Sequence, residues 1–151
     1  MTRLTLSLVA IVLVAVACRT PGQPPTRPTQ GEYRDIIRRE LDSAGSALAS
    51  GELVLRYVEA RRLPDTYAAV TLRQAANDLR KVAQDLGEIQ SPQRATRAQA
   101  RLRAICRRDG RSLTIIHTHL DDLRQRRRVR IAITRDARVL VEQLGKQLDS
   151  G

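Results

Sequence analysis

Residues 65–90, DTYAAVTLRQAANDLRKVAQDLGEIQ, decide the fold class, because their apolar side chains recur at three- and four-residue steps. That spacing puts them on one stripe of an α-helix that faces a core. Asp65 or Thr66 is the expected N-cap, since a short polar side chain accepts a backbone N–H at a helix start. The stripe consists of Leu72, Ala76, Leu79, Val82, Leu86 and Ile89.

The preceding segment has the same pattern, from Glu32 to a helix end before Leu63-Pro64. Arg61 and Arg62 suit the negative C-terminal end of this first helix. A helix is therefore predicted on each side of the proline. The apolar stripe of the first one consists of Ile37, Leu41, Ala44, Leu48, Leu55 and Val58.

A third helix is expected to start at Ser91-Pro92, because a serine cap followed by proline is a favoured helix beginning. Its end is ambiguous, since the apolar pattern continues almost to the C-terminus. One possible turn lies at Asp109-Gly110, with Ser112 capping a fourth helix. The other lies near Gln125–Val129, with the third helix running through Gly110.

The composition agrees with helices packed on helices. Hydrophobic residues make up 42% of the chain, yet it has no Phe or Trp and only 3 Tyr. The core must therefore consist of Leu, Ile, Val and Ala, and every connection between the expected helices is short. We predict an all-α fold in one domain over residues 32–151, an up-and-down antiparallel bundle of three to four helices.

Residues 1–18 have the ordered parts of an export signal. Arg3 precedes an apolar run over residues 4–17, which is shorter than the roughly 20 residues of a membrane-spanning helix. The stretch Ala15-Val16-Ala17-Cys18 resembles the lipobox of bacterial lipoproteins, with Ala15 where Leu is commonest. The remainder is similar only in general character to small helical lipoproteins of GC-rich bacteria.

This resemblance implies that the Cys18 thiol receives a diacylglycerol and that residues 1–17, the signal peptide, are then cleaved off. Cys18 would hold the protein by its lipid on the extracytoplasmic face of the cell membrane, or on an outer membrane if the source has one. Cleavage after Ala17 by the ordinary signal peptidase, or an uncleaved anchor, are the alternatives.

Residues 18–31 are expected to form the lipidated cysteine and a disordered, proline-rich tether. Fully extended, residues 19–30 would reach about 35–40 Å at about 3.1 Å per residue. No chemistry is expected within this segment. Its prolines are Pro21, Pro24, Pro25 and Pro28.

The formal net charge of +11 is unevenly distributed along the chain. Residues 19–90 hold 11 basic and 10 acidic residues, whereas residues 91–138 hold 14 arginines and 4 acids. Around 124–130 the arginines surround a full helical turn, so that segment is expected to project or to form a bundle end. A solvated basic face without a partner is one interpretation, and attachment to an anionic surface is the other.

We expect the second interpretation, with phospholipid headgroups, an anionic wall polymer or an acidic protein as the partner. Nucleic acid is not expected, because an exported protein does not meet it and no aromatic residues alternate with the arginines for base stacking. The oligomeric state is left open. The expected binding residues are Arg94, Arg97, Arg101, Arg107, Arg108, Arg124, Arg126, Arg127, Arg128 and Arg130.

The small-residue run from Ser43 to Gly51, SAGSALASG, suggests a different function. Glycine in a helix costs about 1 kcal/mol relative to alanine, so a close neighbouring helix or a local kink should offset it. The alternative is a hinge or the wall of a ligand cavity between helices. The chain would then be a small-ligand carrier or sensor.

Catalytic and cofactor sites are not expected. His117 and His119 are two residues apart, so on a helix they would point in different directions and could not bind one metal ion together. No haem attachment site, Glu-x-x-His pair or activated serine is present. The chain is therefore expected to be non-enzymatic, without cofactor or metal.

Cys106 is the single thiol that remains after lipidation of Cys18. It lies beside Ile105 on the apolar stripe, which favours a buried, inert cysteine. An intermolecular disulfide is the alternative, because an exported protein meets an oxidising compartment.

Overall fold

The computed structural model describes residues 28–92, 95–140 and 142, and within these ranges it contains helices and no strand. The predicted all-α fold is confirmed. The helices are α1 (Gln30–Glu59), α2 (Asp65–Glu88), α3 (Thr96–Ile116) and α4 (Leu123–Val139). Residues 1–27, which include the expected signal segment, Cys18 and most of the expected tether, lie outside the described residues.

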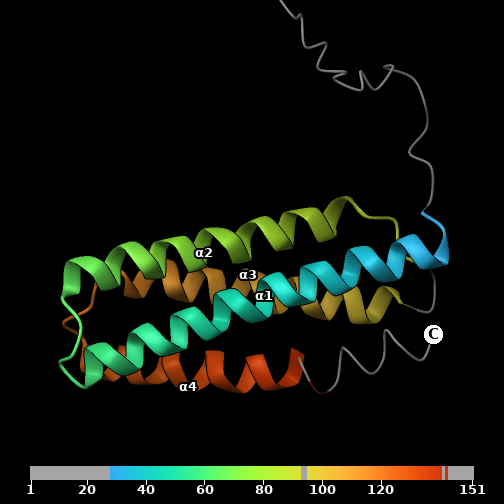
Figure 1. The fold of residues 1–151 in the computed structure, drawn as a ribbon. Coiled ribbons are helices and arrows are strands. Elements are labelled where there is room, and N and C mark those ends of the chain that lie inside the picture. The colour runs from blue at the N-terminus through green and yellow to red at the C-terminus, as the bar shows by residue number, and fades with distance from the viewer. Residues whose placement is uncertain (1–27, 93–94, 141, 143–151) are drawn as a thin grey trace, which may run out of the picture.

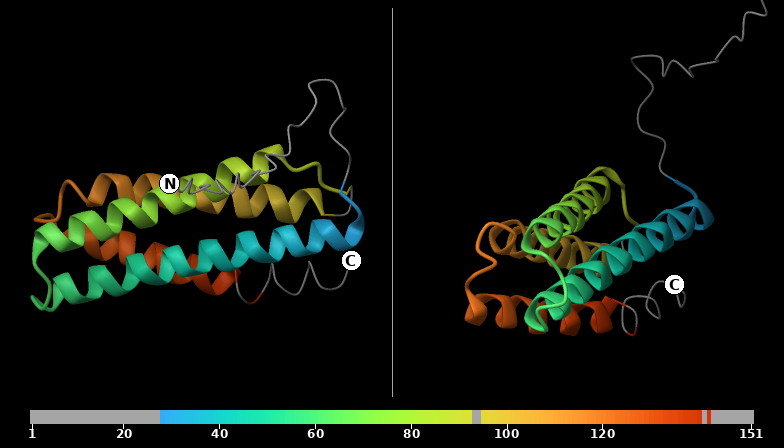
Figure 2. Two further views of the ribbon diagram at one scale, coloured as in Figure 1. Left: turned by 45° about the horizontal axis from the view of Figure 1, so that its top comes forward. Right: turned by 60° about the vertical axis from the view of Figure 1, so that its left-hand side comes forward.

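Consecutive helices run in opposite directions and form a four-cornered bundle (Figures 1 and 2). α1 packs against α2 and α4, and α3 packs against α2 and α4, so the α1–α2 side lies opposite the α3–α4 side. The α1–α2 and α3–α4 connections lie together at one end of the bundle, called here the turn end (Figure 1). α1 begins at the other end, where the tether would leave.

The core between the helices is built from aliphatic side chains, as the composition predicts. Burying one large aliphatic side chain contributes about 1.5–3 kcal/mol, so these positions carry most of the favourable free energy of folding. Among the residues that the structure describes, eleven large side chains are fully buried: Ile37, Leu48, Leu55, Leu72, Leu79, Leu86, Leu102, Leu113, Ile116, Ile133 and Leu140.

α1 begins two residues earlier than expected because of a capping box. The Thr29 hydroxyl accepts a hydrogen bond from the Glu32 backbone N–H, and the Glu32 carboxylate accepts one from the Thr29 backbone N–H at 2.8 Å. These bonds lower the pKa of the Glu32 carboxyl. A threonine three residues before a glutamate is a recognisable start signal, so the sequence did contain this boundary.

α1 ends in a Schellman motif in which Arg61 takes the position usually occupied by glycine. The Arg61 N–H donates to the Val58 carbonyl at 3.0 Å, and the Arg62 N–H donates to the Tyr57 carbonyl at 2.9 Å. Arg61 has φ 55°, the one non-glycine residue with positive φ among the described residues. A side chain in this conformation costs about 1–2 kcal/mol.

We expect Arg61→Gly to raise the free energy of unfolding by about 1 kcal/mol, because glycine adopts positive φ without strain. Chemical denaturation of both proteins would measure the difference. Ala60→Gly is the matched control, since Ala60 has φ −78° and should gain nothing. An equal or larger gain at Ala60 would show that positive φ is not the cause.

The starts of α2 and α3 differ from the expectations. Pro64, rather than Asp65 or Thr66, is the N-cap of α2, and Asp65 is the first helical residue. α3 begins at Thr96 instead of at Ser91-Pro92. Ser91 and Pro92 still act at this boundary, because the Thr96 hydroxyl lies 3.1 Å from the Ser91 hydroxyl and donates to the Pro92 carbonyl at 3.2 Å.

Both expected positions for the last turn are wrong, although the helix does run through Gly110. The turn occupies residues 117–122, and Asp122 caps α4 by accepting from the Gln125 N–H at 2.9 Å. Gly110 serves packing: a Cβ there would lie 3.4 Å from the Ala76 carbonyl oxygen on α2. Ser112 is inside α3 and donates to the Arg108 carbonyl, so it caps nothing.

The small-residue run from Ser43 to Gly51 does not interrupt α1, which is continuous through it. Gly51 faces the core, where an added Cβ would lie 3.3 Å from Leu113 Cδ1 of α3 and 3.5 Å from Ile133 Cδ1 of α4. Close approach of neighbouring helices therefore explains this glycine. Gly45 has open space beside it and no such explanation.

Candidate anionic-surface interface

Most of the predicted arginines lie on the exposed surfaces of α3 and α4, and Arg94 lies outside the described residues. Within the described part of the chain, a subset of the arginines on α3 and α4 makes no hydrogen bond or ion pair through the guanidinium group. Arg138, which sequence reasoning did not select, belongs to this subset. Its members, called here the arginine surface, are Arg97, Arg101, Arg107, Arg124, Arg127, Arg128 and Arg138.

Two further predicted arginines form ion pairs within the protein. Arg108 forms ion pairs with Asp109 on its own helix and with Asp136 on α4. Arg130 Nε lies 3.0 Å from Glu59 Oε2, which joins α4 to the end of α1. These two are partly neutralised, and their ion pairs join α4 to α3 and to α1.

Arg126 does not belong to a surface site. Its side chain is buried at the start of α4, with 7% of the residue exposed, and its Nε has no hydrogen-bond partner. Of the five arginines between residues 124 and 130, Arg126 is therefore buried and Arg130 is paired with Glu59. The other three, Arg124, Arg127 and Arg128, are exposed. The segment forms an end of the bundle and does not project.

The charge asymmetry of the sequence becomes an asymmetry across the bundle. Residues 30–88, which form α1 and α2, hold 9 basic and 10 acidic side chains. Residues 95–140, which form α3 and α4, hold 13 arginines and 4 acids. Because the α1–α2 side lies opposite the α3–α4 side, the positive charge is concentrated on one side of the molecule.

Two of the four acids on the basic side are themselves buried. Asp109 is 1% exposed and Asp136 is 4% exposed, and they meet Arg108 and Arg135 where α3 packs on α4. Burial raises the pKa of the Asp109 carboxyl, although the hydrogen bond from Arg108 opposes this shift. These carboxylates bind their nearest arginines, so they do not cancel the charge of the arginine surface.

Gln99 of α3 joins α1, α2 and α3 at the end of the bundle where α1 begins, a role that the sequence did not reveal. Its Nε2 donates to the carbonyls of Leu86 at 2.6 Å and Ile89 at 3.0 Å, at the C-terminal end of α2. Its Oε1 accepts from the buried Tyr33 hydroxyl at 3.0 Å. One amide therefore satisfies groups on α1 and α2.

Cys106 is fully buried and free, as the first of the two expectations stated. Burial raises the pKa of its thiol to about 12, with a further contribution from the Asp109 carboxylate. A disulfide requires the two sulfur atoms to approach to about 2 Å. The folded protein therefore does not offer Cys106 to a second molecule.

We expect Cys106 to resist alkylation in the folded protein and to react readily after unfolding, because the thiolate is the nucleophile. With a pKa of about 12, about one hundredth of the thiol would be thiolate at pH 10. Mass spectrometry after iodoacetamide treatment of a Cys18→Ser chain, with and without denaturant, would measure this. Complete labelling of the native protein would contradict the burial of Cys106.

The two histidines lie in the 117–122 turn instead of on a helix, contrary to the expectation. His117 Nδ1 contacts the Thr114 carbonyl oxygen, and His119 Nδ1 lies 3.1 Å from the Ile115 carbonyl oxygen. Within the described ranges, no three His, Cys, Asp or Glu side chains are grouped to hold a metal ion.

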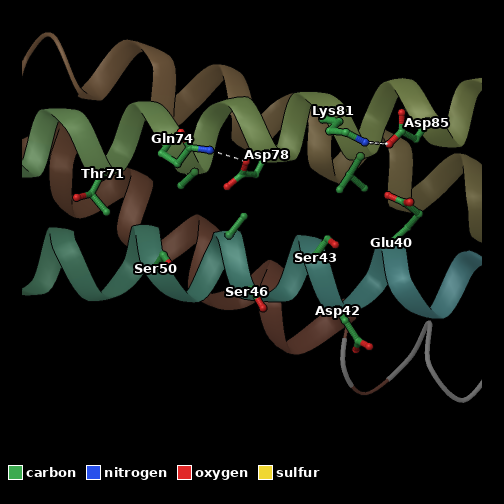
Figure 3. A pocket seen from close by; sticks show the side chains of 13 residues that line it. Glu40, Asp42, Ser43, Ser46, Ser50, Thr71, Gln74, Asp78, Lys81 and Asp85 are labelled. Atoms are coloured by element: carbon green, nitrogen blue, oxygen red, sulfur yellow. Dashed lines mark hydrogen bonds and ion pairs between the residues drawn. The ribbon is translucent and has the colours of Figure 1, made fainter. Parts of the chain in front are cut away.

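A groove of about 580 Å³ lies between α1 and α2, beside the run from Ser43 to Gly51. Figure 3 shows Gln74 and Asp78 on α2 across from Ser50 and Ser46 on α1, and Asp85 across from Glu40. The groove is open, because most of its polar side chains, including those of Ser43, Ser46 and Gln74, are exposed. Partial burial and the nearby Asp85 carboxylate raise the pKa of the Glu40 carboxyl.

No helix in the described part of the chain has the length and apolar character needed to cross a bilayer. The arginine surface and the α1–α2 groove, described above, are the two surface features on which a functional proposal can rest. Searches against models of protein families, curated proteins and solved structures found no match to this chain.

Proposed function

We propose that the chain is a membrane-tethered, non-enzymatic lipoprotein whose helical domain binds an anionic component of the cell envelope. In this proposal Cys18 carries the lipid and residues 19–29 connect it to α1. The arginine surface of α3 and α4 makes the contact. The anionic component is a lipid headgroup layer, a wall polymer or an acidic protein.

The observation that carries the proposal is the set of seven arginines without partners on one pair of helices. A basic side chain close to an anionic membrane contributes about 1 kcal/mol, so several together give substantial affinity without a shaped pocket. Attraction of this kind extends over about 8 Å at physiological ionic strength. A rigid bundle with its charge on one side is suited to it.

The alternative of a small-ligand carrier receives less support. Small-molecule sites enclose most of the ligand surface and are lined mainly by apolar side chains. The groove beside Ser43–Gly51 is open, and acidic and hydroxyl side chains line much of it. It fits an extended cationic partner better than a small apolar ligand.

The chain from residue 18 onward, with Cys18→Ser, keeps every described helix and lacks the lipid, so it isolates the arginine surface. We expect it to bind vesicles that contain anionic phospholipid, and expect its affinity to fall as salt rises. Vesicles of neutral phospholipid should not bind it. Equal sedimentation with both vesicle types would remove the electrostatic part of the proposal.

The lipid part is tested separately in cells. We expect Cys18→Ala to abolish labelling by a fatty-acid analogue and to release the protein from the membrane fraction, because no other residue would carry the lipid. Cys106→Ala is the matched control and should change neither result. Unchanged labelling and retention of the Cys18→Ala protein would refute the lipid attachment.

A further inference from the structure

The α1–α2 side carries the chemical complement of α4. Two contiguous hollows between α1 and α2, of about 580 and 680 Å³, share Glu40 and Asp85. Seven of the ten acidic residues of α1 and α2 line them, and among the described lining residues the bases are Lys81 and Arg39. These acids, called here the acidic groove, are Glu32, Asp35, Glu40, Asp42, Asp78, Asp85 and Glu88.

Towards the turn end the same side becomes apolar and aromatic. Leu53 and Tyr57 follow Ser50 on α1 at helical three- and four-residue steps. Tyr67 and Val70 precede Thr71 and Gln74, which line the groove on α2, by one helical turn. All four side chains are large and exposed; Tyr67 is 61% and Val70 65% exposed. Exposed tyrosines beside apolar side chains are typical of protein interfaces.

The outer surface of α4 changes in the same order along its axis, from apolar near the turn end to charged further away. Leu123 and Ile131, 66% and 56% exposed, lie nearer the turn end. Arg135 and Arg138 follow them, about 18 and 22 Å from Leu123 at 1.5 Å per residue. On α2, Asp78 and Asp85 lie about 16 and 27 Å from Tyr67 by the same measure. If α4 of one molecule were laid along the α1–α2 side of another with both turn ends together, the apolar residues of the two surfaces would face each other. The arginines of α4 would then face the carboxylates of the acidic groove.

We propose that α4 of a second copy of this chain docks along the α1–α2 side, with its arginines on the acidic groove and Leu123 and Ile131 on the apolar end. The contact joins two different surfaces, so each copy can accept one neighbour and donate to another. Arg124, Arg127 and Arg128 of the incoming helix lie at the tyrosine end, where Arg–Tyr contacts are favourable.

The geometry relates the copies by translation, because the turn ends of both lie side by side. Every copy therefore points the end where α1 begins in the same direction, as bundles tethered to one membrane must. The basic sides of neighbouring copies remain about a bundle width apart, roughly 20 Å from helix dimensions. This exceeds the screening length of about 8 Å, so repulsion between copies is weak beside the direct contact.

The test uses two variants of the unlipidated chain from residue 18 onward. The groove variant carries Glu40→Gln, Asp78→Asn and Asp85→Asn, and the α4 variant carries Arg124→Gln, Arg127→Gln, Arg128→Gln and Arg138→Gln. All seven residues are at least partly exposed, so both variants should keep their helical circular dichroism. We expect the original chain to form species larger than dimers at low salt, and monomers at high salt.

Each variant alone should associate about 30-fold more weakly than the original chain. The groove variant loses three carboxylates that face arginine, and the α4 variant loses the charge of Arg138 and the Arg–Tyr contacts of Arg124, Arg127 and Arg128. An equimolar mixture should form a 1:1 dimer and nothing larger, since only one contact remains complete. Analytical ultracentrifugation distinguishes these species. A monomeric original chain, unchanged association of the groove variant, or a mixture without dimer would each overturn the proposal.

This inference does not depend on the proposed binding to an anionic envelope component. The groove variant keeps the whole arginine surface, so it should bind anionic vesicles at least as well as the original chain. Loss of self-association with retained vesicle binding, or the reverse, separates the two proposals.

Discussion

Replacing Arg124, Arg127, Arg128 and Arg138 with glutamine is expected to weaken binding to anionic vesicles by about a thousandfold. Each basic residue near an anionic membrane contributes about 1 kcal/mol, and four of them correspond to about three factors of ten. Glutamine has nearly the helix propensity of arginine, so α4 should remain folded. Vesicle sedimentation at one fixed salt concentration would measure the affinities.

This prediction depends on charges that are not already used within the protein. Arg126 is excluded because it is buried, and Arg130 is excluded because it pairs with Glu59. Adding Arg130→Gln to the four substitutions should therefore lower vesicle affinity by less than any one of the four does. A larger effect of Arg130 would mean that its ion pair opens when the surface binds.

Gln99→Leu is expected to lower the free energy of unfolding by about 3 kcal/mol, because it leaves the buried Leu86 carbonyl, the partly buried Ile89 carbonyl and the Tyr33 hydroxyl without this partner. The leucine side chain has about the same volume as the glutamine side chain, so the loss of stability would come from the missing hydrogen bonds. Urea denaturation followed by circular dichroism would measure it.

Two further variants serve as references for the change in free energy of unfolding that Gln99→Leu causes. Tyr33→Phe removes one of the three hydrogen bonds, and should cost about 1 kcal/mol. Gln84→Leu changes an exposed glutamine of α2 and should stay within about 0.5 kcal/mol of the original chain. A cost for Gln99→Leu no larger than that of Gln84→Leu would contradict the role given to this amide.

The helices themselves were predictable because the apolar residues, which the fold buries, recur in the sequence at the helical period. The stripe from Leu72 to Leu86 reads as one face of α2, and the structure buries all its members up to Leu86. The last turn was not predictable in the same way. Asp109-Gly110 has the residue types of a helix end, but the nearby α2 backbone is the reason for the glycine.

The candidate site was predictable as a region but not residue by residue. An excess of arginine over residues 91–138 is visible in the sequence, whereas the burial of Arg126 and the pairing of Arg108 depend on neighbouring helices. The acidic groove could not be seen at all. Glu40 and Asp85 are far apart in the chain and come together only when α1 packs on α2.

Binding to anionic surfaces should depend on where the arginines lie on α3 and α4, and not only on the net charge of the chain. The measurement that tests this dependence compares two unlipidated variants, each lacking four arginines and therefore equal in net charge. One is the α4 variant, with Arg124, Arg127, Arg128 and Arg138 changed to glutamine. The other carries glutamine at four exposed positions of α1, its C-terminal loop and α2: Arg34, Arg56, Arg62 and Arg73.

Both variants would be sedimented with anionic vesicles over a series of salt concentrations. We expect the α4 variant to lose most of its affinity and its salt dependence, while the variant of the α1–α2 side keeps nearly all of both. Equal losses in the two variants would contradict this expectation, because binding would then follow the total charge and not the arginine surface of α3 and α4.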